Sequence, residues 1–121
     1  MAKYVLLLGG ADLDKRSGNA ALAPEMFRHF ARWLGSLRDK GQYVASHKLK
    51  DQTGARLTVR GGQVVEGPFM ETKEAVGGLF VVEAASLAEA IALARECPTL
   101  SLQNGFVEVR AVEEVPRVGD A

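Results

Sequence analysis

The chain has 121 residues, a length that suits one domain built around one hydrophobic core. Hydrophobic residues make up 47% and charged residues 25%, as in ordinary folded globular proteins. The 15 basic residues are balanced by 15 acidic ones, so the sequence lacks the positive excess that phosphate binding requires. We therefore expect no nucleic-acid partner and no attraction to an anionic membrane surface.

The single cysteine, Cys97, has no second cysteine with which to form an internal disulfide. This favours a reducing compartment and predicts a cytoplasmic protein. The apolar run at the N-terminus is too short for a signal peptide, and no stretch approaches the roughly 20 apolar residues of a membrane span. No membrane partner is expected.

The first elements in chain order are a strand and a helix. Residues Tyr4–Leu8 are continuously apolar and end at two glycines, which predicts a strand covered on both faces. After a polar loop, Gly10–Ala23, a helix is predicted from Pro24, which is tolerated in a first helical turn, to Gly41. Its apolar residues follow helical spacing and predict one buried stripe: Phe27, Phe30, Ala31, Leu34 and Leu37.

A second strand and a hairpin follow. Residues Tyr43–Leu49 alternate, so that Tyr43, Ala45, His47 and Leu49 are predicted to share one face. The runs Leu57–Arg60 and Gln63–Glu66 flank a Gly-Gly pair, which indicates a β-hairpin. A loop, Gly67–Val76, comes next.

The last part of the chain predicts a strand, a helix and a strand. Leu79–Glu83 is apolar on both faces. Ser86 and Glu89 form a capping box for a helix that Pro98 ends, with a predicted apolar stripe of Leu87, Ala90, Ile91, Ala94 and Cys97. Gly105–Val112 alternates as a final strand. We expect a single domain over residues 1–115 and a flexible C-terminal tail over residues 116–121.

Two β-α-β units around a hairpin predict an α+β fold, with both helices on one face of an antiparallel sheet. Because the strands Tyr4–Leu8 and Leu79–Val82 are apolar on both sides, the other sheet face also needs cover. A second copy of the chain in a two-fold homodimer would provide it. The alternative is a monomer whose two long loops fold over the sheet.

Residues 66–83, EGPFMETKEAVGGLFVVE, resemble the signature of the DGPF, or YCII-related, family. Lys3-Tyr4 and the segment Val107–Arg110 also stand where that family has similar residues. The resemblance implies a ferredoxin-like protomer and a dimeric α+β barrel, related to muconolactone-isomerase-like and chloromuconolactone-dehalogenase-like proteins. Many members of the family have no assigned activity, and some are encoded beside extracytoplasmic-function sigma factors.

Two residues are candidates for catalysis. His47 lies in the middle of a predicted strand, and histidine is the usual general base near neutral pH. The alternative is a histidine that only makes structural hydrogen bonds. Glu66 stands where the family usually has aspartate, so its carboxylate is one methylene further out. A displacement of about 1 Å at a catalytic group can cost on the order of 100-fold in rate.

Five residues are candidates for substrate binding. Glu108 and Arg110 alternate with valines, so they are predicted to face away from the helices, as a ligand site or as a structural ion pair. Glu71 and Lys73 belong to the signature segment, and Tyr43 is an aromatic that would line a pocket or the core. The sequence has no dinucleotide-binding or Walker motif, and its two histidines and one cysteine are widely spaced. We expect no cofactor and no metal site.

These observations predict a dimer that binds a small organic ligand between the sheet and the signature loop. If it is an enzyme, the expected class is cofactor-free acid/base chemistry, isomerase- or dehalogenase-like, on a carboxylated or lactone-like compound. His47 would be the base and Arg110 the anchor. The alternative is a non-catalytic ligand-binding protein or a regulatory partner, linked to an extracytoplasmic-function sigma factor. A solvent-connected pocket containing His47 and a carboxylate would favour the enzyme.

Overall fold

The computed structural model describes residues 1–10, 24–50, 53–67 and 76–115. The predicted tail and most of the two long loops lie outside these residues. No helix in the described ranges is long and apolar enough to cross a membrane. The elements are, in chain order, β1 (Ala2–Gly9), α2 (Pro24–Asp39), β2 (Tyr43–Lys48), β3 (Leu57–Arg60), β4 (Gln63–Glu66), β5 (Val76–Ala84), α3 (Leu87–Arg95), the 3-10 helix η2 (Pro98–Ser101) and β6 (Phe106–Ala111).

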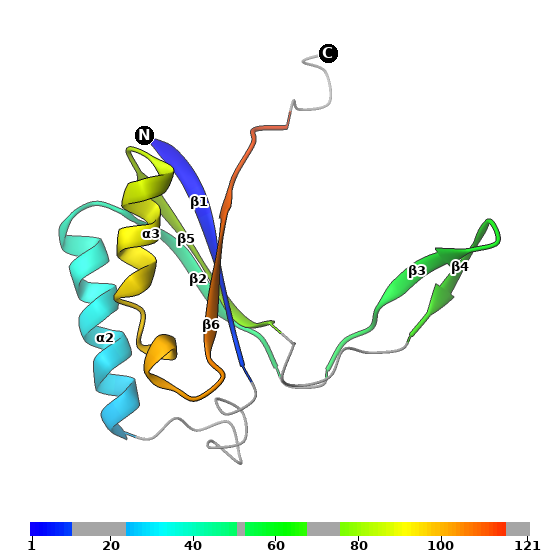
Figure 1. The fold of residues 1–121 in the computed structure, drawn as a ribbon, viewed down its shortest axis with the longest axis horizontal. Helices are drawn as coiled ribbons and strands as arrows, with labels where there is room; N and C mark the ends of the chain where they lie inside the picture. Colours follow the sequence, from blue (N-terminus) through cyan, green and yellow to red (C-terminus); the bar gives the residue numbers. More distant parts are fainter. Residues whose placement is uncertain (11–23, 51–52, 68–75, 116–121) are drawn as a thin grey trace.

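Four strands form one antiparallel sheet in the order β2-β5-β1-β6. Helices α2 and α3 cover one face of this sheet, and no described helix covers the other (Figure 1). We call the second face the open face. This arrangement confirms the predicted α+β, ferredoxin-like fold.

The core lies between the sheet and the two helices. The indole of Trp33 is buried, its N–H donates to the backbone oxygen of Leu93 at 3.2 Å, and its ring meets Phe80 edge-on at 4.8 Å. The predicted stripe of α2 is therefore wrong in part, because Phe27 is 65% exposed and Ala31 is exposed. Turning the helix toward Trp33 buries a larger side chain and gives its N–H a partner. The buried residues are Tyr4, Leu6, Leu8, Trp33, Leu37, Val82, Ala84, Ala90, Ala94 and Cys97.

Helix α3 begins at the predicted cap. The Glu89 N–H donates to Ser86 Oγ at 3.2 Å, and the Glu89 carboxylate accepts from the Ala85 N–H at 2.8 Å and from the Gln42 side chain at 3.2 Å. The second half of the capping box thus reaches one residue further back than predicted. Its predicted stripe is confirmed for Ala90, Ala94 and Cys97, which are buried, and wrong for Leu87 and Ile91, which are exposed. The small buried residues let the helix approach the sheet closely.

An irregularity in β2 changes which of its side chains share a face. Tyr43 pairs with Val82, but the next paired residue is Ala45, with Val81. The extra residue places Tyr43 on the helix side, together with Ser46, and leaves Ala45 and His47 on the open face. The prediction that Tyr43 and His47 share a face is wrong for this reason.

The predicted hairpin β3–β4 is confirmed, with Gly61 and Gly62 at its turn in the left-handed region (φ 56° and 79°). It extends away from the four-stranded sheet on the side opposite to the helices (Figure 1).

Candidate functional site

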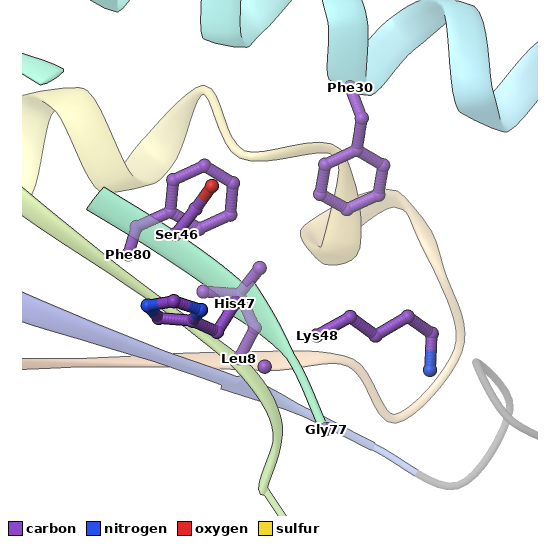
Figure 2. Close-up of a pocket in the computed structure, with 8 residues that line it drawn as sticks. Leu8, Phe30, Ser46, His47, Lys48, Gly77 and Phe80 are labelled. Carbon is purple, nitrogen blue, oxygen red and sulfur yellow. The ribbon is translucent and has the colours of Figure 1, made fainter. Parts of the chain in front are cut away.

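An apolar pocket lies between helix α2 and the edge of the sheet where β2 pairs with β5 (Figure 2). Its volume is about 200 Å³. Engineered apolar cavities of about 150 Å³ hold a benzene molecule, so this pocket has room for one ring and a small substituent. The lining residues are Leu8, Phe30, Ser46, His47, Lys48, Gly77, Gly78 and Phe80.

A missing side chain keeps the floor of the pocket open. Gly78 pairs with Leu8 of β1 and with Lys48 of β2, and it precedes Phe80 on the helix side of β5. A Cβ at Gly78 would lie 3.1 Å from the backbone oxygen of His47, closer than most such contacts. Glycine therefore leaves space where any other residue would occupy the floor.

Two phenylalanines form the walls, and one buried tryptophan holds both. Trp33 meets Phe80 at a centroid distance of 4.8 Å and Phe30 at 6.4 Å, both edge-to-face. Aromatic pairs in this geometry attract each other beyond the apolar area that they bury. The rings that would contact a ligand are thus positioned by the core itself.

The pocket has few polar groups. Ser46 projects between the sheet and α2 (Figure 2), and its Oγ lies 2.8 Å from the Tyr43 hydroxyl. Tyr43 is itself held under the guanidinium of Arg38, 4.8 Å from the centre of the ring. The Lys48 side chain runs along the pocket from the same strand (Figure 2), with Nζ 3.4 Å from the Leu49 backbone oxygen. One hydroxyl and one ammonium therefore border the otherwise apolar pocket.

His47 borders this pocket, but its ring belongs to the other face of the sheet. It pairs with Leu79 of β5, whose side chain lies on the open face, and Figure 2 shows the imidazole turned away from Phe30. A position in the middle of a strand, on the same face as Ala45 and Leu49, predicts partial burial of His47. This prediction is wrong, because the side chain is exposed in the single chain. The physical reason is that β2 is an edge strand and no described element covers its open face.

Glu108 and Arg110 lie on the open face of β6, as predicted. They form an ion pair at 3.2 Å with both side chains more than half exposed. His47 occupies the same row as Glu108, with Leu79 and Leu7 between them. Three strand spacings of about 4.8 Å separate them by about 14 Å, so one chain does not bring them together.

The remaining predicted site residues are also dispersed. Glu66 is exposed at the end of β4, on the hairpin that stands away from the sheet (Figure 1). Tyr43 packs against the core and supports Ser46 from behind. Glu71 and Lys73 lie outside the described residues.

Cys97 and metal-binding groups add nothing to this site. Cys97 is 2% exposed, as its place in the predicted apolar stripe implies, and burial raises the pKa of its thiol. The described part of the chain contains no cluster of three or more histidine, cysteine, aspartate or glutamate side chains that would hold a metal ion.

Sequence reasoning missed most of the pocket. Three of its lining residues are apolar side chains that the sequence assigns to the core: Leu8, Phe30 and Phe80. Ser46 is a polar residue that was predicted to lie on the strand face opposite to His47. The available signal was Gly77-Gly78, which lie near the start of the same strand as Phe80. A glycine inside a strand often marks a place where a ligand or another backbone approaches closely.

Fold and pocket together define an α+β protein of ferredoxin-like topology with a small apolar cavity under helix α2. The family model of the YCII-related domain matches residues 20–116. The chain therefore belongs to the YCII-related family. It is also similar to an uncharacterised protein of Rhizobium meliloti (strain 1021), with 43% identity over 47 residues. That similarity spans 39% of this chain and 38% of the Rhizobium protein, well under half of either.

Proposed function

We propose that this protein binds a small, mostly apolar ring compound that carries an acidic or lactone group. The observation that carries the proposal is the pocket of about 200 Å³ between Phe30 and Phe80, with its floor left open by Gly78. Ligand sites are commonly concave and apolar, with a few polar groups that fix orientation. This pocket fits that description in its lining, and its volume of about 200 Å³ is below the usual range of about 300–1,000 Å³, which limits it to a small ligand.

The polar groups indicate how such a ligand would lie. Its ring would pack between the two phenylalanines, and the Ser46 hydroxyl would bond an oxygen of the substituent. A carboxylate directed outward would meet the ammonium of Lys48. A lactone, which carries no charge, would accept a hydrogen bond from the Ser46 hydroxyl alone.

Binding is favoured over acid/base catalysis by His47 or Glu66. The His47 ring lies on the opposite face of the sheet, and Glu66 is on the hairpin. Among the described lining residues, no carboxylate or imidazole points into the pocket beside the phenylalanines. A general base must come within hydrogen-bond reach of the proton it removes. Neither predicted catalytic residue meets that condition within one chain.

We also infer that the chain forms a homodimer through its open face. Val5, Leu7, Leu79 and Val81 form the centre of this face and are only partly buried in the single chain. A contiguous apolar patch of this kind usually marks an interaction surface. The unpaired, buried Cys97 suits a reducing compartment such as the cytoplasm.

Ligand binding can be measured with the chain's only tryptophan, because Trp33 contacts both pocket phenylalanines. Benzoate, its neutral analogue benzamide and the aromatic lactone phthalide would be titrated while Trp33 fluorescence is followed. We expect a saturable change with benzoate and with phthalide. The absence of a saturable change with all three probes would contradict the proposal.

Two adjacent residues of β2 provide matched variants. Lys48→Gln should weaken benzoate binding about five-fold, the equivalent of about 1 kcal/mol for an exposed ion pair, and leave phthalide binding unchanged. His47→Gln should change neither affinity, since its ring lies on the other face. Loss of binding in His47→Gln with normal binding in Lys48→Gln would place the ligand on the open face and revive the catalytic hypothesis.

A further inference from the structure

A second hollow lies between helix α2 and the part of the chain that runs from the end of α3 into η2. Its volume is about 670 Å³, more than three times that of the apolar pocket, and the two share no lining residue. We call it the helix groove. Its walls all lie on the helix side of the sheet (Figure 1), so a partner on the open face would not cover it.

Positive side chains line both walls of the helix groove. Arg32 and Lys40 come from the α2 wall and Arg95 from the α3 wall, and all three are exposed. Within the part of the chain that the structure describes, none of the three forms an ion pair. Glu96 is the one acidic residue among the described residues of the lining. A chain with no net charge therefore concentrates positive charge in this groove.

The charges of the α2 wall are spread along a line. Arg32, Ser36 and Lys40 follow one another at intervals of four residues, and the Lys40 N–H donates to the Ser36 oxygen at 3.3 Å, which extends the helical turn to Lys40. At 1.5 Å per residue, Arg32 and Lys40 are about 12 Å apart along the helix. One compact anion is bound best by donors that converge on it, which this spacing does not provide. Residues i and i+4 of an extended peptide are about 13 Å apart and point to the same side.

An apolar surface accompanies these charges. Leu100 of η2 is 45% exposed, and Leu93 and Pro98 beside it in the lining are only partly buried. An apolar side chain that lies between two carboxylates would cover Leu100. A nucleic acid fits less well, because its phosphates gain nothing from Leu100 and are repelled by the carboxylate of Glu96.

We propose that the helix groove binds an acidic peptide segment of a partner protein. The segment is extended, and it carries two carboxylates four residues apart with an apolar residue midway between them. The carboxylates pair with Arg32 and Lys40, the apolar side chain packs on Leu100, and Arg95 adds positive charge from the opposite wall. Charge complementarity of this kind selects the partner and steers its approach. The site depends neither on a ligand in the apolar pocket nor on a dimer.

The first test uses two matched peptides and the full chain. The peptide Ser-Glu-Ser-Leu-Ser-Glu-Ser carries fluorescein at its N-terminus, and the second peptide has glutamine in place of both glutamates. Fluorescence anisotropy should show saturable binding of the acidic peptide and binding at least about five-fold weaker for its neutral analogue. Raising NaCl from about 0.05 M to about 0.5 M should weaken the first and not the second, because salt screens exposed charges. Equal affinities, or no binding of the acidic peptide at protein concentrations up to about 1 mM, would contradict the proposal.

Two pairs of variants locate the contact. Arg32→Gln should weaken binding of the acidic peptide about five-fold, while Arg28→Gln, the same change one turn earlier and outside the lining, should stay within about two-fold of wild type. Leu100→Ser should weaken binding of both peptides, whereas Leu87→Ser, at an equally exposed leucine outside the groove, should not. All four side chains are exposed, so the variants should fold, which circular dichroism would check. Equal losses within either pair would show attraction without a site and would overturn the proposal.

Competition and chemical shifts separate the other occupants. Displacement of the acidic peptide by pyrophosphate at equal concentration would mean that a compact anion suffices, and tighter binding of single-stranded oligothymidine would mean a nucleic-acid site; either result would overturn the proposal. In ¹⁵N spectra of the wild-type chain, we expect the acidic peptide to shift the amides of Ser36, Lys40, Glu96 and Leu100. Shifts confined to open-face amides such as Leu79 would place the peptide elsewhere and refute the assignment.

Discussion

Replacing Gly105 with alanine should destabilise the protein, although this glycine has no left-handed backbone. A Cβ at Gly105 would lie 2.1 Å from the backbone oxygen of Thr99 and 3.1 Å from that of Leu102. Neither oxygen is the end of a flexible side chain, so the backbone between η2 and β6 must shift. Overpacking of this kind costs about 1–3 kcal/mol and occasionally more.

Gly35→Ala is the matched control. Gly35 lies inside helix α2, and a Cβ there would meet nothing within 4 Å. Alanine is favoured over glycine in a helix interior by about 1 kcal/mol, so this variant should be more stable than wild type. The same chemical change should therefore shift stability in opposite directions at the two positions.

Thermal unfolding followed by circular dichroism would measure both effects. For a chain of this size, 1 kcal/mol corresponds to a change in Tm of roughly 3–6 °C. Gly105→Ala should melt roughly 5–15 °C below wild type, and Gly35→Ala a few degrees above it. A Gly105→Ala variant that melts within about 2 °C of wild type would refute the packing argument for the η2–β6 connection.

Two further predictions concern helix α3 and the residue that follows it. Ser86→Ala removes the Oγ that accepts the Glu89 N–H, and it should lower the free energy of unfolding by about 0.5–2 kcal/mol in urea titrations; an unchanged midpoint would mean that Ser86 does not cap the helix. Cys97 should react with a thiol-specific reagent at pH 8 much more slowly in the native protein than in guanidinium, because it is buried and its pKa is raised. Equal rates in the two states would show that the thiol is accessible.

The order and type of the elements could be predicted from the sequence because local signals agree along the chain. Pro24 marks the start of α2, Ser86 caps α3, and Gly61-Gly62 forms the hairpin turn. These signals act over a few residues and do not depend on what packs above them. The two β-α-β units then favoured a sheet with both helices on one face, which the structure shows.

The faces of the elements were harder to predict, because packing decides them. A helical stripe containing Phe27 satisfies the spacing rule as well as one containing Trp33. The structure selects Trp33 because its N–H reaches Leu93 and its ring meets Phe80. In β2, one extra residue moves Tyr43 to the other side of the sheet. The local sequence does not predict that irregularity, because the irregularity depends on how β2 pairs with β5.

The candidate site was harder still to predict, because the volume of the pocket depends on the absence of a side chain. Reasoning from titratable groups led to His47 and Glu66, which the fold places on the open face and on the hairpin. The pocket instead depends on Gly78, where the chain leaves room, and on Phe30 and Phe80, which would read as ordinary core. A sequence pattern can predict which side chains are buried. It is a poorer guide to where the packing of those side chains leaves a cavity. A strand with two glycines near its start, under a helix that carries aromatic residues, therefore indicates a pocket only after the helix and strand have been placed against each other.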